Sequence, residues 1–206
     1  ESKTEKNYNF NSNLKKIFKS KKIWCAASTH NTEERICATV HEKLKNKYKN
    51  LLTIIIPRHT QRADEITNEI RDMGLKVQAH SSSSKTNNNT EIYLVDTFGE
   101  TKSFFKICKT VFLGGSIINH GGQNPLEPVR FGCRILHGPN IQNFTEVYNL
   151  LEKNNLSHKF YNSNQLAKLV DKSFGKNMNT SNKIRKIKKT GSNILNNTLI
   201  EINHYL

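Results

Sequence analysis

The chain of 206 residues carries 32 lysine and arginine side chains against 17 aspartate and glutamate side chains, a formal net charge of +15. This excess lies at the two ends, because residues 3–22 and 172–189 hold seven basic side chains each, whereas residues 23–171 carry 18 basic and 14 acidic ones. A nearly balanced centre with few aromatic residues among its basic ones argues against a nucleic-acid-binding module.

The first 21 residues are polar, and only Leu14, Ile17 and Phe18 show any apolar patterning there. The sequence begins abruptly at Glu1, without a secretory signal. We therefore expect residues 1–21 to be a linker that follows another domain of a longer protein.

Strand and helix patterns alternate after this stretch, which is typical of a parallel sheet with crossover helices. Predicted strands cover residues 22–27, 51–56, 76–80 and 91–95. Predicted helices cover residues 33–48 and 62–73. Thr32 is the expected N-cap of the first helix, Pro57 ends the second strand and Gly74 closes the second helix. Residues 81–90 (SSSSKTNNNT) are interpreted as a low-complexity loop.

The second half continues the alternation. Strands are predicted at residues 111–113 and 134–136, and helices at residues 101–108, from Pro125 onward, and at 143–154 and 164–173. The sequence thus predicts one α/β domain over residues 22–175, a Rossmann-like parallel sheet flanked by helices. Residues 176–206 carry an apolar stripe at helical spacing, which indicates an amphipathic helix that either covers a protein surface or contacts a membrane.

The cysteines and the hydropathy of the sequence indicate the cellular compartment in which the chain folds. Cys25, Cys37, Cys108 and Cys133 lie in apolar surroundings without C-x-x-C spacing, so we interpret them as small buried hydrophobes of a reducing cytoplasm. No apolar run approaches the roughly 20 residues of a membrane span. The basic ends suit an anionic membrane surface or a flexible tail, or reflect only a coding bias toward lysine.

The most informative stretch is residues 114–132, GGSIINHGGQNPLEPVRFG, directly after a predicted strand. Glycines let a backbone come close to a ligand, and the N–H groups at a helix start attract anions. Pro125 suits the first position of a helix, and the carboxylate of Glu127 can accept hydrogen bonds from sugar hydroxyls. The stretch predicts recognition of a nucleotide's ribose and phosphate, and the alternative is a glycine-rich turn that merely packs.

Ligands of an open parallel sheet bind outside the carboxyl ends of its strands. Four loops leave strands in that sense, and they contain Ser28, Thr29 and His30; Pro57, Arg58 and His59; residues 96–100; and Gly114, Gly115 and Ser116. The planar fork of Arg58 suits a phosphate, although a surface ion pair is the alternative. His30 and His59 can donate to a phosphate or carboxylate, while Glu100 either binds a base or sugar or caps the next helix. No P-loop, zinc site, Ser/His/Asp set or G-x-G-x-x-G fingerprint is present, and we expect neither a cofactor nor a metal.

Four blocks of sequence, AASTH (residues 26–30), PRH (57–59), DTFGE (96–100) and GGS…GGQNPLEP (114–128), resemble the C-terminal domain of the 3-deoxy-D-manno-octulosonic acid (Kdo) transferases. Gly138-Pro139 followed by Asn143-Phe144 extends the likeness. The blocks occur in order from about residue 22 to 170, and their combination is specific whereas each alone is weak.

The resemblance implies the C-terminal half of a GT-B glycosyltransferase that moves Kdo from CMP-Kdo to lipid IVA, the lipid A precursor, with inversion and without a metal. The family acts in lipopolysaccharide core synthesis at the cytoplasmic face of the bacterial inner membrane. Its cytidine nucleotide contacts would fall on Pro57, Arg58, Phe98, Gly99, Glu100, Asn124, Pro125, Leu126 and Glu127. Further donor contacts are possible at Ser28, Thr29, His30, His59, Gly114, Gly115 and Ser116.

Two positions depart from the family pattern, since Phe98 stands where the family usually has Met and Gln123 where it has His. Phe98 can keep an apolar contact, but we expect no proton transfer at Gln123. The family's general base and acceptor-lipid surface lie in an N-terminal domain, so we expect no catalytic residue in this chain and no turnover by it alone. Arg58 and N–H groups of the glycine-rich loop and of the helix at Pro125 would stabilise the CMP leaving group.

Three other functions stay open at this point. One is a different GT-B-like enzyme that uses a UDP-sugar, such as an epimerase or a hexose transferase. The others are a basic nucleic-acid-binding module and an interaction domain with a vestigial nucleotide site.

Overall fold

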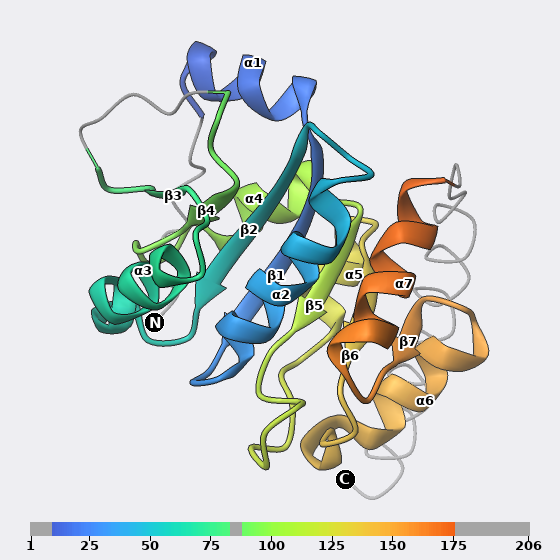
Figure 1. The fold of residues 1–206 in the computed structure, drawn as a ribbon. Helices are drawn as coiled ribbons and strands as arrows, with labels where there is room; N and C mark the ends of the chain where they lie inside the picture. Colours follow the sequence, from blue (N-terminus) through green and yellow to red (C-terminus); the bar gives the residue numbers. More distant parts are fainter. Residues whose placement is uncertain (1–9, 83–87, 176–206) are drawn as a thin grey trace, which may run out of the picture. The chain divides into compact units, whose positions relative to one another are not determined.

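The computed structural model describes residues 10–82 and 88–175, and a single parallel sheet of seven strands is the centre of this part (Figure 1). The strands are β1 (Lys22–Thr29), β2 (Leu51–Pro57), β3 (Val77–Ala79), β4 (Ile92–Leu94), β5 (Thr110–Leu113), β6 (Arg134–His137) and β7 (Ser157–Lys159). Their order across the sheet is β3-β4-β2-β1-β5-β6-β7, and every neighbouring pair is parallel. The predicted α/β class with a Rossmann-like sheet is confirmed.

Helices cover both faces of this sheet. They are α1 (Ser12–Ser20), α2 (Glu33–Lys45), α3 (Ala63–Asp72), α4 (Thr101–Ile107), α5 (Leu126–Arg130), α6 (Thr145–Lys153) and α7 (Ser163–Phe174), with short 3-10 turns η1 (Thr60–Arg62) and η2 (Gln142–Phe144). In Figure 1, α2 and α7 lie side by side in front of the sheet, whereas α4 and α5 lie behind it. None of the helices described here has the length and apolar character needed to cross a membrane.

The central strands are buried because both faces of the sheet are covered. All seven residues of β2 are buried, as its uninterrupted apolar run predicts. Trp24, Ile55 and Phe112 from the sheet pack with Val40 of α2 and Val170 of α7 in one core. Burying apolar surface of this kind is the main favourable term in folding.

The four cysteines are buried and free, in agreement with their interpretation as small core residues. Burial raises the pKa of the Cys37 thiol well above its usual value, and the same holds for Cys108. These thiols are therefore protonated and unreactive in the folded chain.

The described end of the predicted linker is helical. Asn11 caps α1 by accepting the N–H of Leu14 on its side chain at 2.9 Å, and Leu14, Ile17 and Phe18 are buried. The Phe18 ring meets the ring of Tyr93 on β4 edge-on, at 5.4 Å between centroids. The apolar residues of this stretch thus attach it to the sheet, while the existence of a domain before residue 1 stays a prediction.

Several boundaries differ from those predicted. β1 runs two residues further, to Thr29, and Pro57 belongs to β2. Thr32 precedes α2 as expected but makes no capping hydrogen bond from its side chain, because its φ of 75° turns the backbone into the left-handed region. Gly74, with φ of 79°, closes α3 as predicted.

Strand β7 was not predicted, because its three residues, SHK, are too few and too polar to show a strand pattern. The predicted helix in residues 176–206 lies outside the described residues. So do residues 83–87 of the predicted low-complexity loop.

Candidate functional site

The topology of the sheet places the predicted loops together. All strands run in the same direction, so their carboxyl ends share one edge of the sheet. The chain goes from β1 to β2 on one side, whereas β5 pairs with β1 on the other side, so the strand order reverses between β1 and β5. Such a switch point is where open α/β sheets bind their ligands.

The backbones of the loops after β1 and β5 touch at Gly114. Its N–H donates to the carbonyl of Ala27 at 2.9 Å. A Cβ at this position would lie 2.3 Å from the carbonyl oxygen of Ser28 and 2.6 Å from the Cα of Thr29. Ser28 itself has φ of 55° at a register shift that ends β1. Only glycine fits at residue 114, so this glycine serves close packing of the two loops.

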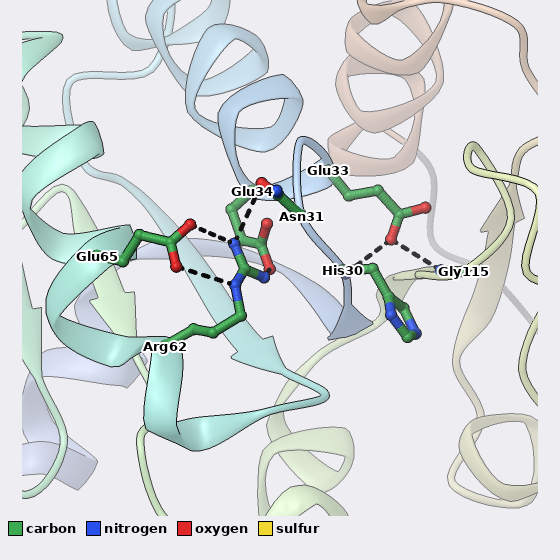
Figure 2. Close-up of polar contacts among 7 residues, drawn as sticks. All are labelled: His30, Asn31, Glu33, Glu34, Arg62, Glu65 and Gly115. Atoms are coloured by element: carbon green, nitrogen blue, oxygen red, sulfur yellow. Dashed lines mark hydrogen bonds and ion pairs between the residues drawn. The ribbon is translucent and has the colours of Figure 1, made fainter.

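Glu33 is the residue that holds these two loops in place (Figure 2). It is the first residue of α2, and its side chain is fully buried. Its carboxylate accepts backbone N–H groups from His30 at 3.0 Å, Gly115 at 2.7 Å, Ser116 at 3.2 Å and Ile117 at 3.0 Å. Four such bonds satisfy a buried carboxylate and bind the loops after β1 and β5 to the start of α2.

This arrangement corrects one expectation. The N–H groups of Gly115, Ser116 and Ile117 donate to Glu33, so they are not available to stabilise the leaving group of a bound nucleotide. The glycine-rich loop does form an anion-binding concavity, but a carboxylate of the chain itself fills it. Glu33 was not predicted as a site residue, and the acidic pair that opens α2 is its one visible signal in the sequence.

Ser116 and Thr29, both predicted as possible donor contacts, are wholly buried. The Ser116 hydroxyl donates to the carbonyl of Leu113 at 2.6 Å and accepts the N–H of Gly138 at 2.9 Å. A Cβ on Gly138 would lie 2.2 Å from the Ser116 carbonyl oxygen, so Gly138 also serves close packing. The Ser116 side chain is therefore bonded within the chain and is not exposed to a ligand.

A second buried carboxylate lies beside the first. Glu34 is fully buried and pairs with Arg62 at 3.1 Å, while Arg62 also binds Glu65 at 3.1 Å (Figure 2). Burial raises the pKa of Glu34, and the hydrogen bonds and charge around it, the guanidinium of Arg62 included, oppose this shift. The pair ties α2 to the segment that leads from β2 into α3. Neither Glu34 nor Arg62 was predicted to have a role.

Three imidazoles meet at the same edge of the sheet. His30 follows β1, His59 follows β2 and His120 lies in the loop after β5. The His30 ring lies 5.8 Å from the ring of His59 and 4.3 Å from that of His120, centroid to centroid. We call these three residues the histidine cluster. His30 and His59 were predicted site residues, whereas His120 was not.

His30 is the inner member of the histidine cluster. It is 8% exposed, and its Nε2 is buried without a hydrogen-bond partner. Burial lowers its pKa to about 4, and the positive charges of His120, His59, Arg58 and Arg62 add to this effect. At neutral pH the ring is therefore uncharged in the free chain.

Arg58 and His59 are exposed at the end of β2. The backbone N–H of Arg58 donates to the carbonyl of Thr29 at 2.9 Å, which holds the loop after β2 beside the loop after β1. The predicted neighbourhood of Arg58, His59 and His30 is therefore present. Pro57, also predicted as a contact, is buried as the last residue of β2.

The loop after β4 joins this edge through Glu100. Its Oε2 accepts the Thr97 hydroxyl at 2.8 Å and pairs with Nε2 of His80 at 2.7 Å. Glu100 occupies the N-cap position of α4, as one alternative predicted, but its side chain makes no capping hydrogen bond. Phe98 is 74% exposed, and Gly99 has φ of 85°.

The start of α5 differs from the expectation of free N–H groups. Pro125 directly precedes the helix, and the N–H of Leu126 donates to Oδ1 of Asn124 at 3.0 Å. Glu127 lies 3.5 Å from Nζ of Lys102 on α4, which joins α4 to α5. Asn124 is exposed and Glu127 half-buried, so both side chains can be reached by a ligand. Within residues 10–82 and 88–175, no group of three or more His, Cys, Asp or Glu side chains is arranged to hold a metal ion.

No protein-family model matches the chain. The 3-deoxy-D-manno-octulosonic acid transferase of Haemophilus influenzae is 37% identical over 129 residues, which are 63% of this chain and 30% of that protein. The enzyme of the same name from Aquifex aeolicus is 31% identical over 165 residues, which are 79% of this chain and 45% of that protein. The chain thus spans less than half the length of these relatives.

Solved structures share the fold. The C-terminal CMP-Kdo binding domain of WaaA from Acinetobacter baumannii matches with a TM-score of 0.77 at 23% identity, covering 85% of this chain and 92% of that chain. An alpha,alpha-trehalose-phosphate synthase (UDP-forming) from Burkholderia vietnamiensis matches with a TM-score of 0.53 at 9% identity, covering 84% of this chain and 42% of that one. The comparisons confirm the resemblance in sequence and the fold class.

Proposed function

We propose that this chain, which is related in sequence to the 3-deoxy-D-manno-octulosonic acid transferases, is the domain of such an enzyme that binds the CMP-Kdo donor. One structural observation carries the proposal. The loops after β1, β2, β4 and β5 lie at one edge of the sheet and flank its switch point, where nucleotide ligands of such sheets bind. The relatives named above act on Kdo, and the solved domain with this fold is a CMP-Kdo binding domain.

In this proposal the donor lies across the switch point with its phosphate at Arg58. Transfer breaks the bond between the anomeric carbon of Kdo and the phosphate oxygen, which leaves negative charge on CMP. The exposed guanidinium of Arg58 stabilises that charge, since the N–H groups at residues 115–117 are bound by Glu33. Asn124 and Glu127 offer oxygens to the ribose hydroxyls from the start of α5.

We extend the proposal to the whole enzyme, with the activity that the family resemblance implies. It transfers Kdo from CMP-Kdo to lipid IVA with inversion and without a metal, at the cytoplasmic face of the inner membrane. In this proposal the general base and the acceptor surface belong to another part of the enzyme, and the chain spans only 30% and 45% of the two relatives. The chain itself holds donor and supplies no catalytic base.

A titration of the labelled chain with CMP, followed through its backbone amides, tests the donor site. We expect amides near Arg58, Gly99, Gly115 and Glu127 to shift together, because their loops share one edge of the sheet. UDP at the same concentration is the control. A stronger response to UDP favours the UDP-sugar alternative, and shifts confined to the basic ends, or none at millimolar CMP, contradict the proposal.

A further inference from the structure

The histidine cluster spans the switch point of the sheet. β1 and β5 flank this point, and the 4.3 Å contact between the rings of His30 and His120 joins the loops that follow these two strands. His59 lies on the loop after β2, and the centroid of its ring is 5.8 Å from that of His30. Three imidazoles from three separate loops therefore surround one position.

One ring nitrogen of His30 has no hydrogen-bond partner at that position. Its Nε2 is buried without a partner, although its ring lies at the edge where ligands bind. A buried polar nitrogen without a hydrogen bond destabilises the free chain, so a group of a bound ligand that pairs with it recovers this loss. Glu33 does not serve this purpose, since it binds the backbone N–H of His30.

The surroundings of His30 decide the charge of that ligand group. The charged groups that act on its ring from neighbouring elements are His120, His59, Arg58 and Arg62, all of them cationic when protonated. A negative group beside the ring is therefore attracted by the guanidinium of Arg58, and by each imidazole when that imidazole is protonated. A neutral imidazole with its proton on Nε2 donates a hydrogen bond to an anionic oxygen.

We propose that the histidine cluster is the subsite for the carboxylate of the sugar acid in the donor. This inference rests on the function proposed above. In CMP-Kdo the carboxylate is attached to the same carbon that is bonded to the phosphate oxygen, so the two anionic groups are neighbours. Arg58 and His59 are neighbours in the same way. The planar fork of Arg58 suits the phosphate, and the single N–H groups of the imidazoles bind the carboxylate.

The test compares binding of CMP and CMP-Kdo by calorimetry, using the chain of 206 residues and its variants His59→Gln, His120→Gln and His30→Gln. His59 and His120 are exposed, so their variants keep the fold, and thermal unfolding checks His30→Gln. We expect each variant to lose about tenfold in affinity for CMP-Kdo and to keep its affinity for CMP. His158→Gln on β7, two strands away from β5, is the matched control and should change neither.

Two outcomes overturn the carboxylate subsite while leaving the proposed function in place. Equal losses for CMP and CMP-Kdo assign the cluster to the phosphate. Unchanged affinity for CMP-Kdo in all three folded variants removes the cluster from the site. A wild-type chain that binds neither compound refutes the proposed function, and the subsite with it.

Discussion

The carboxylate of Glu33 accepts the backbone N–H of Gly115 at 2.7 Å, although 82 residues separate the two in the sequence. The same carboxylate binds the N–H of His30, three residues before it. One buried side chain therefore fixes the loops after β1 and β5 relative to each other. His30 of the histidine cluster and the close approach at Gly114 both lie on the loops that this carboxylate joins.

We expect Glu33→Gln to destabilise the chain by about 2–4 kcal/mol. The amide keeps one acceptor oxygen and replaces the other by an NH2 group, so N–H groups now bound by the carboxylate lose an acceptor while remaining buried. Urea unfolding measures the change in the free energy of unfolding. Glu42→Gln, on the same helix, is the control and should change it by less than about 0.5 kcal/mol. Equal stabilities of the two variants would mean that Glu33 is not essential for holding the loops.

Arg62→Ala should destabilise the chain by about 3 kcal/mol, because it leaves Glu34 buried without its partner. The loss should become smaller as the pH is lowered toward the raised pKa of Glu34, since a protonated carboxyl needs no counter-charge. Unfolding in urea at two pH values measures both effects. Glu65→Gln removes only the exposed partner of Arg62 and should cost less than about 1 kcal/mol. A loss as large for Glu65→Gln would contradict the role given to Glu34.

Arg58→Ala should weaken CMP binding by about 1.5–3 kcal/mol, or roughly ten- to a hundredfold, because a charge-assisted phosphate contact is lost. The fold should be kept, since the Arg58 side chain is exposed. Calorimetry with CMP measures the affinity, and Arg35→Ala, an exposed arginine on α2, is the control. Unchanged affinity in a folded Arg58→Ala chain would make Arg58 an ordinary surface residue.

The stability of the chain should fall as the pH is lowered from about 6.5 to about 4. Burial lowers the pKa of His41 to about 4, and that of His30 likewise, from the ordinary value of 6.5. Between these pH values the unfolded chain binds more protons than the folded one, so protons favour unfolding, by up to about 1.4 kcal/mol per pH unit for a fully buried histidine. Urea unfolding between pH 7 and pH 4.5 measures the slope.

His41→Gln isolates this effect. The glutamine cannot take up a proton, so the dependence of stability on pH should become flatter than in the wild-type chain. His41 is 1% exposed and its Nδ1 lies 2.9 Å from the Thr53 hydroxyl, a contact that a glutamine amide can keep in part. An unchanged slope would show that His41 has the same pKa in the folded and the unfolded chain.

We expect no Kdo transfer when the chain alone is incubated with CMP-Kdo and lipid IVA. The proposed domain binds donor but has neither the base nor the acceptor surface. Product analysis by mass spectrometry checks this, with a longer protein that includes the preceding region as the positive control. Robust product from the chain alone, with full-length enzyme excluded as a contaminant, would place the catalytic base within these residues.

Much of the fold could be predicted from the sequence because burial on both faces gives strands such as β2 an unmistakable apolar run. The end of α3 at Gly74 could be predicted as well, because the left-handed backbone conformation that closes a helix favours glycine. β7 was not predicted because three residues, all with polar side chains, carry no periodicity. A local sequence pattern thus predicts an element when burial or backbone conformation within that element determines its residue types.

The sequence predicted which loops share one edge of the sheet, but not the contacts that hold these loops together. Arg58 and His59 follow a buried strand, and this order alone places them at the ligand edge. Glu33 and His120 were missed because their partners come from loops far away in the sequence and include backbone N–H groups, which have no sequence signature. Glu127 and Asn124 have the exposure that a ligand contact needs, and their roles stay predictions.

The central place of β1 has a consequence for how the chain is made. β1 pairs with β2, which follows it directly, and with β5, which begins only at Thr110. On a ribosome that adds about 5–20 residues per second, Glu33 waits roughly 4–16 seconds for the N–H of Gly115. During that interval β1 has no partner strand on the side where β5 will pair, and the carboxylate of Glu33 lacks the N–H donors of residues 115–117. Until the glycine-rich loop is synthesised, the unpaired edge of β1 in the nascent chain is therefore exposed to pairing with strands of other chains.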